Sequence, residues 1–212
     1  MKPAANPSIS SFSDGMALSL YRTHDAASDD ECKTVPPGSR ERYHMFKIVS
    51  GGQSGADRAA LDAAIEAAIP YGGWCPNGGW AEDMPEPPGV LALYPDLRPT
   101  PETSPGQRTE WNVRDSDALM VLVDSASLAA SKGTGFALNC AAVLKKPHII
   151  IDIDAPDALP KAQGFLADRA GGSLCIGGPR ESEAPGIYTK ALAFVTALFE
   201  LTNSLPRARS PR

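Results

Sequence analysis

Short apolar segments alternate with helical segments along most of the chain, and this alternation limits the possible folds more than any other feature. Residues 46–50 are apolar and β-branched and end in glycines, as a buried parallel strand does. Residues 57–68 place alanine and leucine at helical spacing. Similar patterns predict strands at residues 118–124, 147–153 and 173–176, and helices at residues 107–116, 135–145, 159–169 and 186–201. Because such repetition is typical of a parallel sheet with helices on both faces, we predict a single α/β domain with a Rossmann-like, doubly wound, mainly parallel sheet.

The chain has 212 residues, which suffice for one such domain with additional tails. Residues 1–44 are rich in Ser, Pro and charge and lack an apolar period, so we predict a disordered N-terminal tail. We assign residues 45–205 to the Rossmann-like, ligand-binding domain and residues 206–212 to a C-terminal tail. Met16 and Met45 are alternative starts of translation, and the sequence does not decide between them.

Composition and charge argue against several classes of function. The formal net charge is −5, and Lys and Arg are scattered instead of forming the basic stripe that is typical of nucleic-acid binding. The four cysteines lie far apart without a CxxC pair, so we expect neither a metal site nor a disulfide framework. The sequence shows no apolar run long enough to cross a membrane and no signal peptide. We therefore expect a cytoplasmic protein that binds neither nucleic acid nor a membrane.

A glycine-rich segment, SGGQSGADR at residues 50–58, joins the first predicted strand to the first predicted helix. Open α/β sheets bind ligands at the carboxyl ends of their strands, where a helix N-terminus favours a phosphate. The spacing fits neither the dinucleotide motif GxGxxG nor the P-loop. Asp57 either contacts the ligand or only complements the helix dipole. We predict close backbone approach and side-chain donors for an anion from Gly51, Gly52, Gln53, Ser54 and Gly55.

A second glycine-rich segment, SKGTG at residues 131–135, follows the strand predicted at residues 118–124 and opens another helix. Since it repeats the first arrangement, we expect both segments to converge on a ligand with more than one anionic group. The predicted contacts are Lys132, Gly133 and Thr134, although Thr134 also suits the N-cap of the helix.

The helix predicted at residues 107–116 places Arg108, Asn112 and Asp115 on one face. We predict that Arg108 and Asn112 contact the ligand, because a guanidinium binds phosphate or carboxylate through two hydrogen bonds. The alternative is that Arg108 is an ordinary exposed arginine on a helix.

Residues 71–105 are dense in Gly and Pro and interrupt the alternation, with short strands predicted at residues 73–75 and near Leu97. Long irregular connections of this kind usually form binding loops. The segment at residues 72–83 contains two tryptophans and ends in two carboxylates, which suits a ligand wall or lid. We include Asp83 among the predicted ligand contacts, the alternative being a solvated acidic turn.

Four segments occur in a characteristic order: IVSGGQSGADRAALDAA (48–64), GGWCPNGGWAED (72–83), RTEWNVRDSDALMVLV (108–123), and SKGTGFAL with KKPHIIIDI (131–153). In these segments the chain resembles the molybdenum carrier family, the relatives of YpsA among the DprA- and Lonely-guy-like Rossmann proteins. The resemblance implies a Rossmann-like fold, a homo-oligomer, and a ligand that is either molybdenum cofactor or nucleotide-like. Because molybdopterin carries a phosphate, both ligands place an anion at the glycine-rich segments.

The sequence departs from these relatives at two places. The family often has basic residues in the loop before its AED motif, where this chain has Asn77 to Trp80. Lonely-guy phosphoribohydrolases place a catalytic Glu three residues after the threonine that matches Thr134, and here that position is Ala137. General acid–base cleavage by that route therefore lacks its carboxylate.

We favour a non-catalytic binding or carrier protein for a small phosphorylated ligand, with no catalytic residue assigned. The alternative is a nucleotide-processing hydrolase related to the Lonely-guy enzymes that uses Asp57, Glu82 or Asp83 instead. A regulatory module whose ligand controls partner binding is a third hypothesis, and the long N-terminal segment is its support.

Overall fold

The structure is a computed structural model that describes residues 46–125, 131–167, 169 and 171–204. The chain divides into one unit of residues 1–41 and a second unit of residues 42–212, and all of the described residues belong to the second unit. The tails predicted at residues 1–44 and 206–212 lie outside the described residues.

The described part of the second unit contains one six-stranded sheet in which every pairing is parallel. Its strand order is β3-β2-β1-β6-β4-β5, so the last strand of the chain lies near the middle. The strands are β1 (Phe46–Val49), β2 (Tyr71–Cys75), β3 (Leu97–Pro99), β4 (Ala118–Val123), β5 (His148–Asp152) and β6 (Gly172–Gly177).

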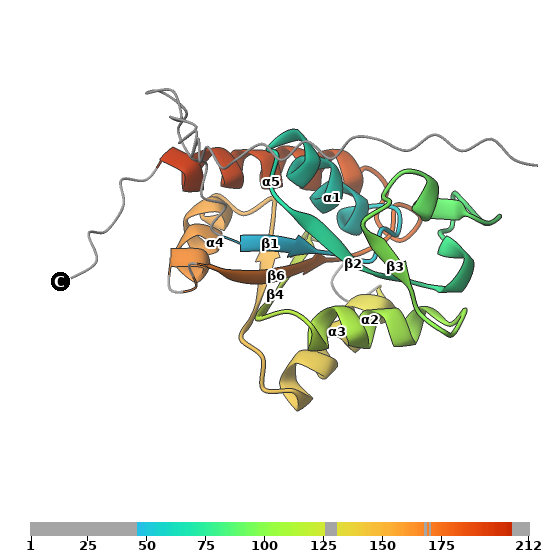
Figure 1. The fold of residues 1–212 in the computed structure, drawn as a ribbon. Coiled ribbons are helices and arrows are strands. Elements are labelled where there is room, and N and C mark those ends of the chain that lie inside the picture. Colours follow the sequence, from blue (N-terminus) through green and yellow to red (C-terminus); the bar gives the residue numbers. More distant parts are fainter. Residues whose placement is uncertain (1–45, 126–130, 168, 170, 205–212) are drawn as a thin grey trace, which may run out of the picture. The chain divides into compact units, whose positions relative to one another are not determined.

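Helices cover both faces of this sheet. Figure 1 shows α1, α4 and α5 over one face and α2 and α3 over the other. The helices are α1 (Ala56–Glu66), α2 (Pro105–Arg114), α3 (Lys132–Val143), α4 (Ala158–Ala167) and α5 (Ile187–Ser204), with short 3₁₀ helices η1 (Asn77–Gly79) and η2 (Gly89–Ala92). The predicted Rossmann-like, doubly wound α/β fold is therefore confirmed.

The two helical layers explain why β4 is apolar at every position. Met120 and Leu122 pack into the core that includes residues of α1, α4 and α5. Leu119 and Val121 point to the opposite face and pack with residues of α2 and α3. A strand buried on both faces has no need for polar residues, which is the pattern that the sequence shows.

The glycine- and proline-rich region between β2 and α2 has a small core of its own. Val90, Tyr94 and Leu97 are buried there against Leu61 of α1. The Tyr94 hydroxyl donates a hydrogen bond of 2.6 Å to Asp62 of α1, which also accepts one of 2.8 Å from the hydroxyl of Tyr188 on α5. This loop region is therefore fastened to the α1–α5 layer.

The position of β6 is the part of the fold that the local sequence pattern did not predict. From β1 the chain adds β2 and β3 on one side, continues with β4 and β5 on the other, and returns to place β6 between β1 and β4. The carboxyl ends of β1, β6 and β4 consequently lie side by side, at the switch point where doubly wound sheets bind ligands.

The end of β6 meets its neighbours so closely that only glycine fits after it. A Cβ atom on Gly178 would lie 2.2 Å from the carbonyl oxygen of Leu122 in β4 and 2.8 Å from the Cβ atom of Ala56 in α1. Both are backbone or near-backbone atoms of regular elements, so neither can move away at low cost.

We expect Gly178→Ala to lower the free energy of unfolding by about 1–3 kcal/mol through overpacking, as measured by urea denaturation. Gly164→Ala is the matched control, because Gly164 lies in α4 with open space around its Cβ position. That exchange should raise the free energy by about 0.5–1 kcal/mol, since alanine favours a helix interior over glycine. Equal effects of the two exchanges would contradict the packing at Gly178.

Candidate functional site

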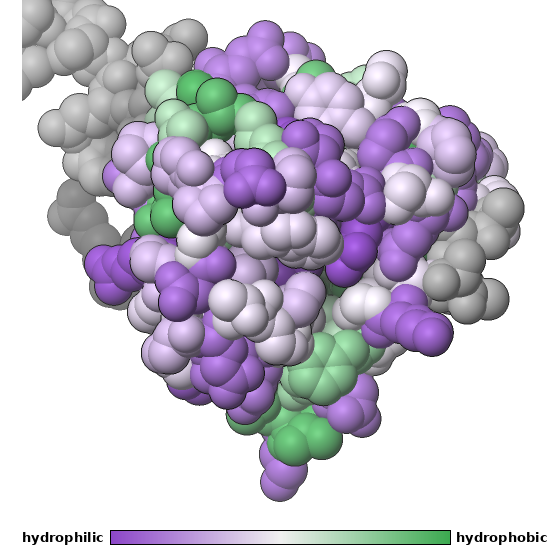
Figure 2. Space-filling model, turned by 90° about the vertical axis from the view of Figure 1, so that its right-hand side faces the viewer, coloured by the Kyte–Doolittle hydropathy of each residue, from purple (hydrophilic) through white to green (hydrophobic). Residues whose placement is uncertain are grey.

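A pocket of about 220 Å³ opens at the carboxyl ends of β1 and β6, bounded by residues of α2 and α3. Figure 2 shows the molecule from this side, with hydrophilic side chains over most of the view and hydrophobic ones gathered towards its lower end and upper left. The pocket is lined by Gly51, Gln53, Asp57, Pro105, Gly106, Arg108, Thr109, Asn112, Val113, Leu119, Val121, Ser131, Lys132, Gly133, Thr134, Phe136, Ala137, Cys175, Ile176, Gly177, Gly178, Arg180 and Glu183.

Residues that we predicted as ligand contacts in three separate segments of the sequence lie together in this pocket. The predicted ligand contacts that line the pocket are Gly51, Gln53, Asp57, Arg108, Asn112, Lys132, Gly133 and Thr134. The remaining predicted contacts, Gly52, Ser54, Gly55 and Asp83, lie outside its lining. The roles of all these residues in ligand binding stay predictions.

A buried ion pair occupies the floor of the pocket. Arg108 Nη1 donates to Asp57 Oδ2 at 2.7 Å, and the side chains are only 12% and 8% exposed. The guanidinium lies over the first glycine-rich turn, where a Cβ atom on Gly51 would be 2.1 Å from Arg108 Nη1. Gly51 therefore gives room to an arginine of the same chain, and Arg108 Nε remains without a hydrogen-bond partner among the described residues.

The second glycine-rich turn forms the N-terminus of α3. The N-cap is Ser131, whose Oγ accepts hydrogen bonds from the Thr134 amide at 3.3 Å and the Thr134 hydroxyl at 2.9 Å. The alternative role of Thr134 as the N-cap is therefore excluded, because Ser131, also a favourable cap, lets the helix begin at Lys132. The first-turn amides of an α-helix have no partner within the helix, and those of α3 belong to residues that line the pocket.

Gln53, Ser54 and Glu82 form a network that fixes the first turn to its neighbours. Gln53 Oε1 accepts hydrogen bonds from the amides of Ser54 at 3.1 Å and Glu82 at 2.9 Å. The Ser54 hydroxyl donates to the Glu82 carboxylate and accepts from the Glu181 amide at 3.2 Å. The predicted donor Ser54 thus has an internal acceptor, whereas Gln53 uses its acceptor oxygen to hold the loop.

The two carboxylates of the loop also have internal partners. Burial alone would raise the pKa of Glu82, but hydrogen bonds from Ser182 and Ser54 hold this pKa below its ordinary value. A hydrogen bond from Arg58 likewise lowers the pKa of Asp83, with which Arg58 forms an ion pair. Asp83, Ser54 and Gly55 line a neighbouring hollow on the far side of the turn instead of the main pocket.

Asn112 is almost fully buried at the base of the pocket and holds α2 to β2. Its Oδ1 accepts from the Trp74 amide at 2.7 Å, and its Nδ2 donates to the Trp74 carbonyl at 2.9 Å. Cys175 of β6 also lines the pocket, and burial raises the pKa of its thiol to about 12. The thiol therefore stays protonated at neutral pH.

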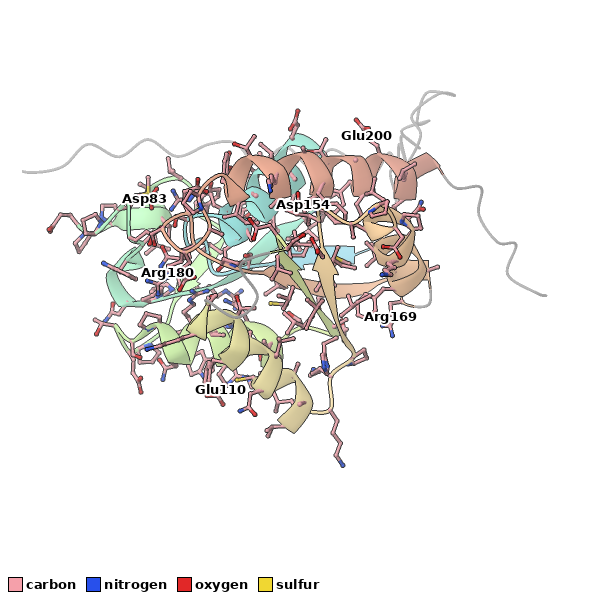
Figure 3. The ribbon with its side chains drawn as sticks, turned by 180° about the vertical axis from the view of Figure 1, so that it is seen from behind. Asp83, Glu110, Asp154, Arg169, Arg180 and Glu200 are labelled. Atoms are coloured by element: carbon pink, nitrogen blue, oxygen red, sulfur yellow. The ribbon has the colours of Figure 1, made fainter. Side chains whose placement is uncertain are left out.

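The turn after β6 contributes residues that were not predicted from the sequence. Gly177 makes room for Asp57, since a Cβ atom there would lie 3.1 Å from Asp57 Oδ1. Arg180 lines the pocket, and its guanidinium lies 5.5 Å from the centre of the Trp80 ring. Figure 3 shows Arg180 at the same edge of the molecule as Asp83. The pair of glycines followed by Arg180 repeats the strand-end pattern of the first turn, which is the signal that could have identified it.

The opposite wall of the pocket is apolar. It consists of Val113, Leu119, Val121, Phe136 and Ala137. Among the described residues, no group of three or more His, Cys, Asp and Glu side chains is arranged to hold a metal ion. None of the helices in the described part is long and apolar enough to cross a membrane.

These features define an α/β protein of the Rossmann-like class with a mixed polar and apolar pocket at the switch point of its sheet. The chain belongs to the circularly permutated YpsA SLOG family, whose family model matches residues 48–199. In the sheet order β3-β2-β1-β6-β4-β5, the last of the described strands lies in the middle of the sheet, between β1 and β4.

A solved structure, that of a "Putative molybdenum carrier protein" from Syntrophus aciditrophicus, is 36% identical in sequence to this chain. The two superpose with a TM-score of 0.65, over 74% of this chain and 95% of the other. No curated protein matches the chain. The YpsA-like family predicted from the sequence motifs is confirmed by these comparisons.

We expect Arg108→Met to lower the free energy of unfolding by about 3 kcal/mol, because it leaves the buried Asp57 carboxylate without its cation. The double variant Asp57→Asn/Arg108→Met should recover much of that loss, since no uncompensated charge remains. A double-mutant cycle from urea denaturation measures the coupling between the two side chains.

The control for this cycle is the exposed pair of Asp157 and Lys161, whose side chains are 54% and 58% exposed. Lys161→Met should change stability by less than about 0.5 kcal/mol, because water screens a surface pair. A double variant whose loss equals the sum of the two single losses would show that Arg108 and Asp57 are not coupled.

Proposed function

We propose that this protein binds a phosphorylated small molecule, either molybdenum cofactor or a nucleotide, in the pocket at the carboxyl ends of β1 and β6. We further propose that it carries or senses this ligand and does not cleave it. The observation that supports this best is the convergence of three strand-to-helix turns around one buried guanidinium.

The phosphate-binding part of the proposal rests on the first turn of α3 and on three cations. The amides at Lys132 and Gly133 lie at the positive end of the helix dipole, where an anion is stabilised. Arg108, Arg180 and Lys132 also line the pocket and carry positive charge. Their combined charge offsets the Asp57 and Glu183 carboxylates that share the pocket.

The ion pair of Arg108 with Asp57 is compatible with anion binding. Only one of the Arg108 nitrogens, Nη1, is used by the Asp57 carboxylate, and Nε has no described partner. Since the guanidinium presents its donors in a fixed fork, Asp57 can orient it while the unused donors bind a phosphate.

The apolar wall supports a ligand that has a planar ring as well as a phosphate. Phe136 and Ala137 of α3 offer apolar contact area for a purine or a pterin, and the almost fully buried side chains of Val113, Leu119 and Val121 lie behind them. Both molybdopterin and a nucleotide meet this description. The cations Arg108, Arg180 and Lys132 fit the phosphate of molybdopterin, and the apolar wall fits its ring.

Ala137 supports binding without cleavage. It lines the pocket on α3, three residues after Thr134, and brings no carboxylate to that position. The carboxylates that do line the pocket are already engaged, Asp57 by Arg108 and Glu183 by the Arg180 amide at 3.0 Å. The similar protein from Syntrophus aciditrophicus is likewise named as a carrier.

We also propose a cytoplasmic homo-oligomer. Exposed apolar side chains on α3 and on the edge strand β5 support self-association, with Phe136 42%, Val143 72% and Ile150 40% exposed.

We expect Gly133→Asp to abolish the rise in melting temperature that AMP, FMN or molybdopterin produces with the wild-type protein. The introduced carboxylate would face the phosphate, and like charges about 4 Å apart near a protein surface repel by about 4 kcal/mol. A Cβ atom at Gly133 meets only Ser131 Oγ at 4.0 Å, so the fold should tolerate the change. At a hundred times its dissociation constant, a ligand adds about 2.7 kcal/mol of stability, which a melting curve resolves.

The matched control is Gly135→Asp, which adds the same charge to the same turn of α3 at a residue outside the pocket lining. It should leave the ligand-induced shift in place. The proposal fails when no phosphorylated probe shifts the wild-type melting curve, or when both aspartate variants respond alike.

We expect no release of free base when the protein at high concentration is incubated with nucleoside monophosphates and the products are separated by chromatography. The reason is that the two carboxylates among the described lining residues, Asp57 and Glu183, already have partners. Product formation that disappears in Asp57→Asn would instead establish the hydrolase.

A further inference from the structure

An apolar hollow of about 410 Å³ lies directly beside the main pocket. Its walls come from the two loops on either side of β3, and they consist mainly of Trp80 with the prolines Pro85, Pro87 and Pro105. Pro105, the first residue of α2, lines both cavities. The hollow therefore adjoins the main pocket at the start of α2.

Arg180 connects the two cavities on their other side. Its guanidinium lies 5.5 Å from the centre of the Trp80 ring, within the range of a cation–π contact, while the same residue lines the main pocket. The positive charge of Arg180 thus lies between the main pocket, which suits a ring with a phosphate, and the hollow, whose largest side chain is that of Trp80.

Planar heterocycles stack on aromatic side chains such as tryptophan, and this stacking tolerates many ring types. The hollow brings few polar groups, so it favours the face of a ring over a second charged group. Neither Trp80 nor the three prolines belong to the core clusters that hold the sheet and its loops together.

We propose that this hollow is a second ring-binding subsite, and that the ligand consists of two planar ring systems joined by a diphosphate. The first ring lies against the apolar wall of the main pocket, the diphosphate lies between Arg108 and Arg180, and the second ring stacks at Trp80. This inference rests on the proposed function, because it extends the same ligand beyond the pocket. Dinucleotides and dinucleotide forms of molybdopterin share this chemistry.

The test compares each two-ring ligand with its one-ring half by calorimetry on the full chain. The probes are NAD⁺ against AMP, FAD against FMN, and molybdopterin guanine dinucleotide against molybdopterin. We expect the two-ring ligand of at least one pair to bind about tenfold more tightly than its half, as one stacked base contributes. The pair that shows this advantage identifies the source of the ligand.

Trp80→Leu should remove the advantage of the two-ring ligand and leave the affinity for the one-ring half unchanged, while Trp80→Phe should keep part of the advantage. Trp111→Leu is the matched control, because Trp111 also has an arginine, Arg114, over its ring at 4.6 Å but lines neither cavity. Unchanged binding of the one-ring half shows that each variant is folded.

Two-ring ligands that bind no more tightly than their halves overturn the inference and leave the proposed function standing. The inference is also overturned if the tighter binding of the two-ring ligand survives Trp80→Leu, or if Trp111→Leu removes it equally. Binding of a proline-rich peptide at Trp80, in place of any second ring, overturns the inference as well. When no probe of either size binds, the proposed function and this inference fail together.

Discussion

The parallel pairing of β6 with both β1 and β4 is the constraint on which the rest of the structure depends. Through these pairings the two halves of the sheet become one, and the carboxyl ends of the three strands are held at fixed spacing. The Ser50 hydroxyl strengthens the joint by donating to the Ile176 carbonyl at 2.8 Å. The first glycine-rich turn, the N-terminus of α3 and the turn that carries Arg180 are positioned by this arrangement.

The fold itself orients the cationic donors of the pocket that we propose as an anion site. Asp57 holds the Arg108 guanidinium over Gly51, and the side chain loses its freedom on folding instead of on binding. The Asp57 carboxylate does not make the proposed anion site unfavourable, because Asp57 and Arg108 together carry no net charge. The contacts of Gln53, Ser54 and Glu82 extend the same rigidity to the surrounding loops.

Local patterns in the sequence were sufficient for the features that depend on local physics. The helices and most strands follow from apolar periodicity, and Arg108 was found because it shares a helical face with Asn112. The cap of α3 was misplaced, because two good capping residues, Ser131 and Thr134, stand three positions apart. Arg180 was missed for a different reason: its place in the pocket depends on the sheet order, which is set by pairings between distant parts of the chain.

Because β6 lies in the middle of the sheet, it also determines the order in which the parts of the structure can form. The bond between Ser50 and Ile176 closes across 126 positions, and such distant contacts are slow to form. During synthesis, β1 to β5 emerge from the ribosome first and lack the strand that joins them. The pocket cannot be complete until residues 175–183, which supply part of its lining, have been translated, so a shorter nascent chain lacks the complete site that we propose for the ligand.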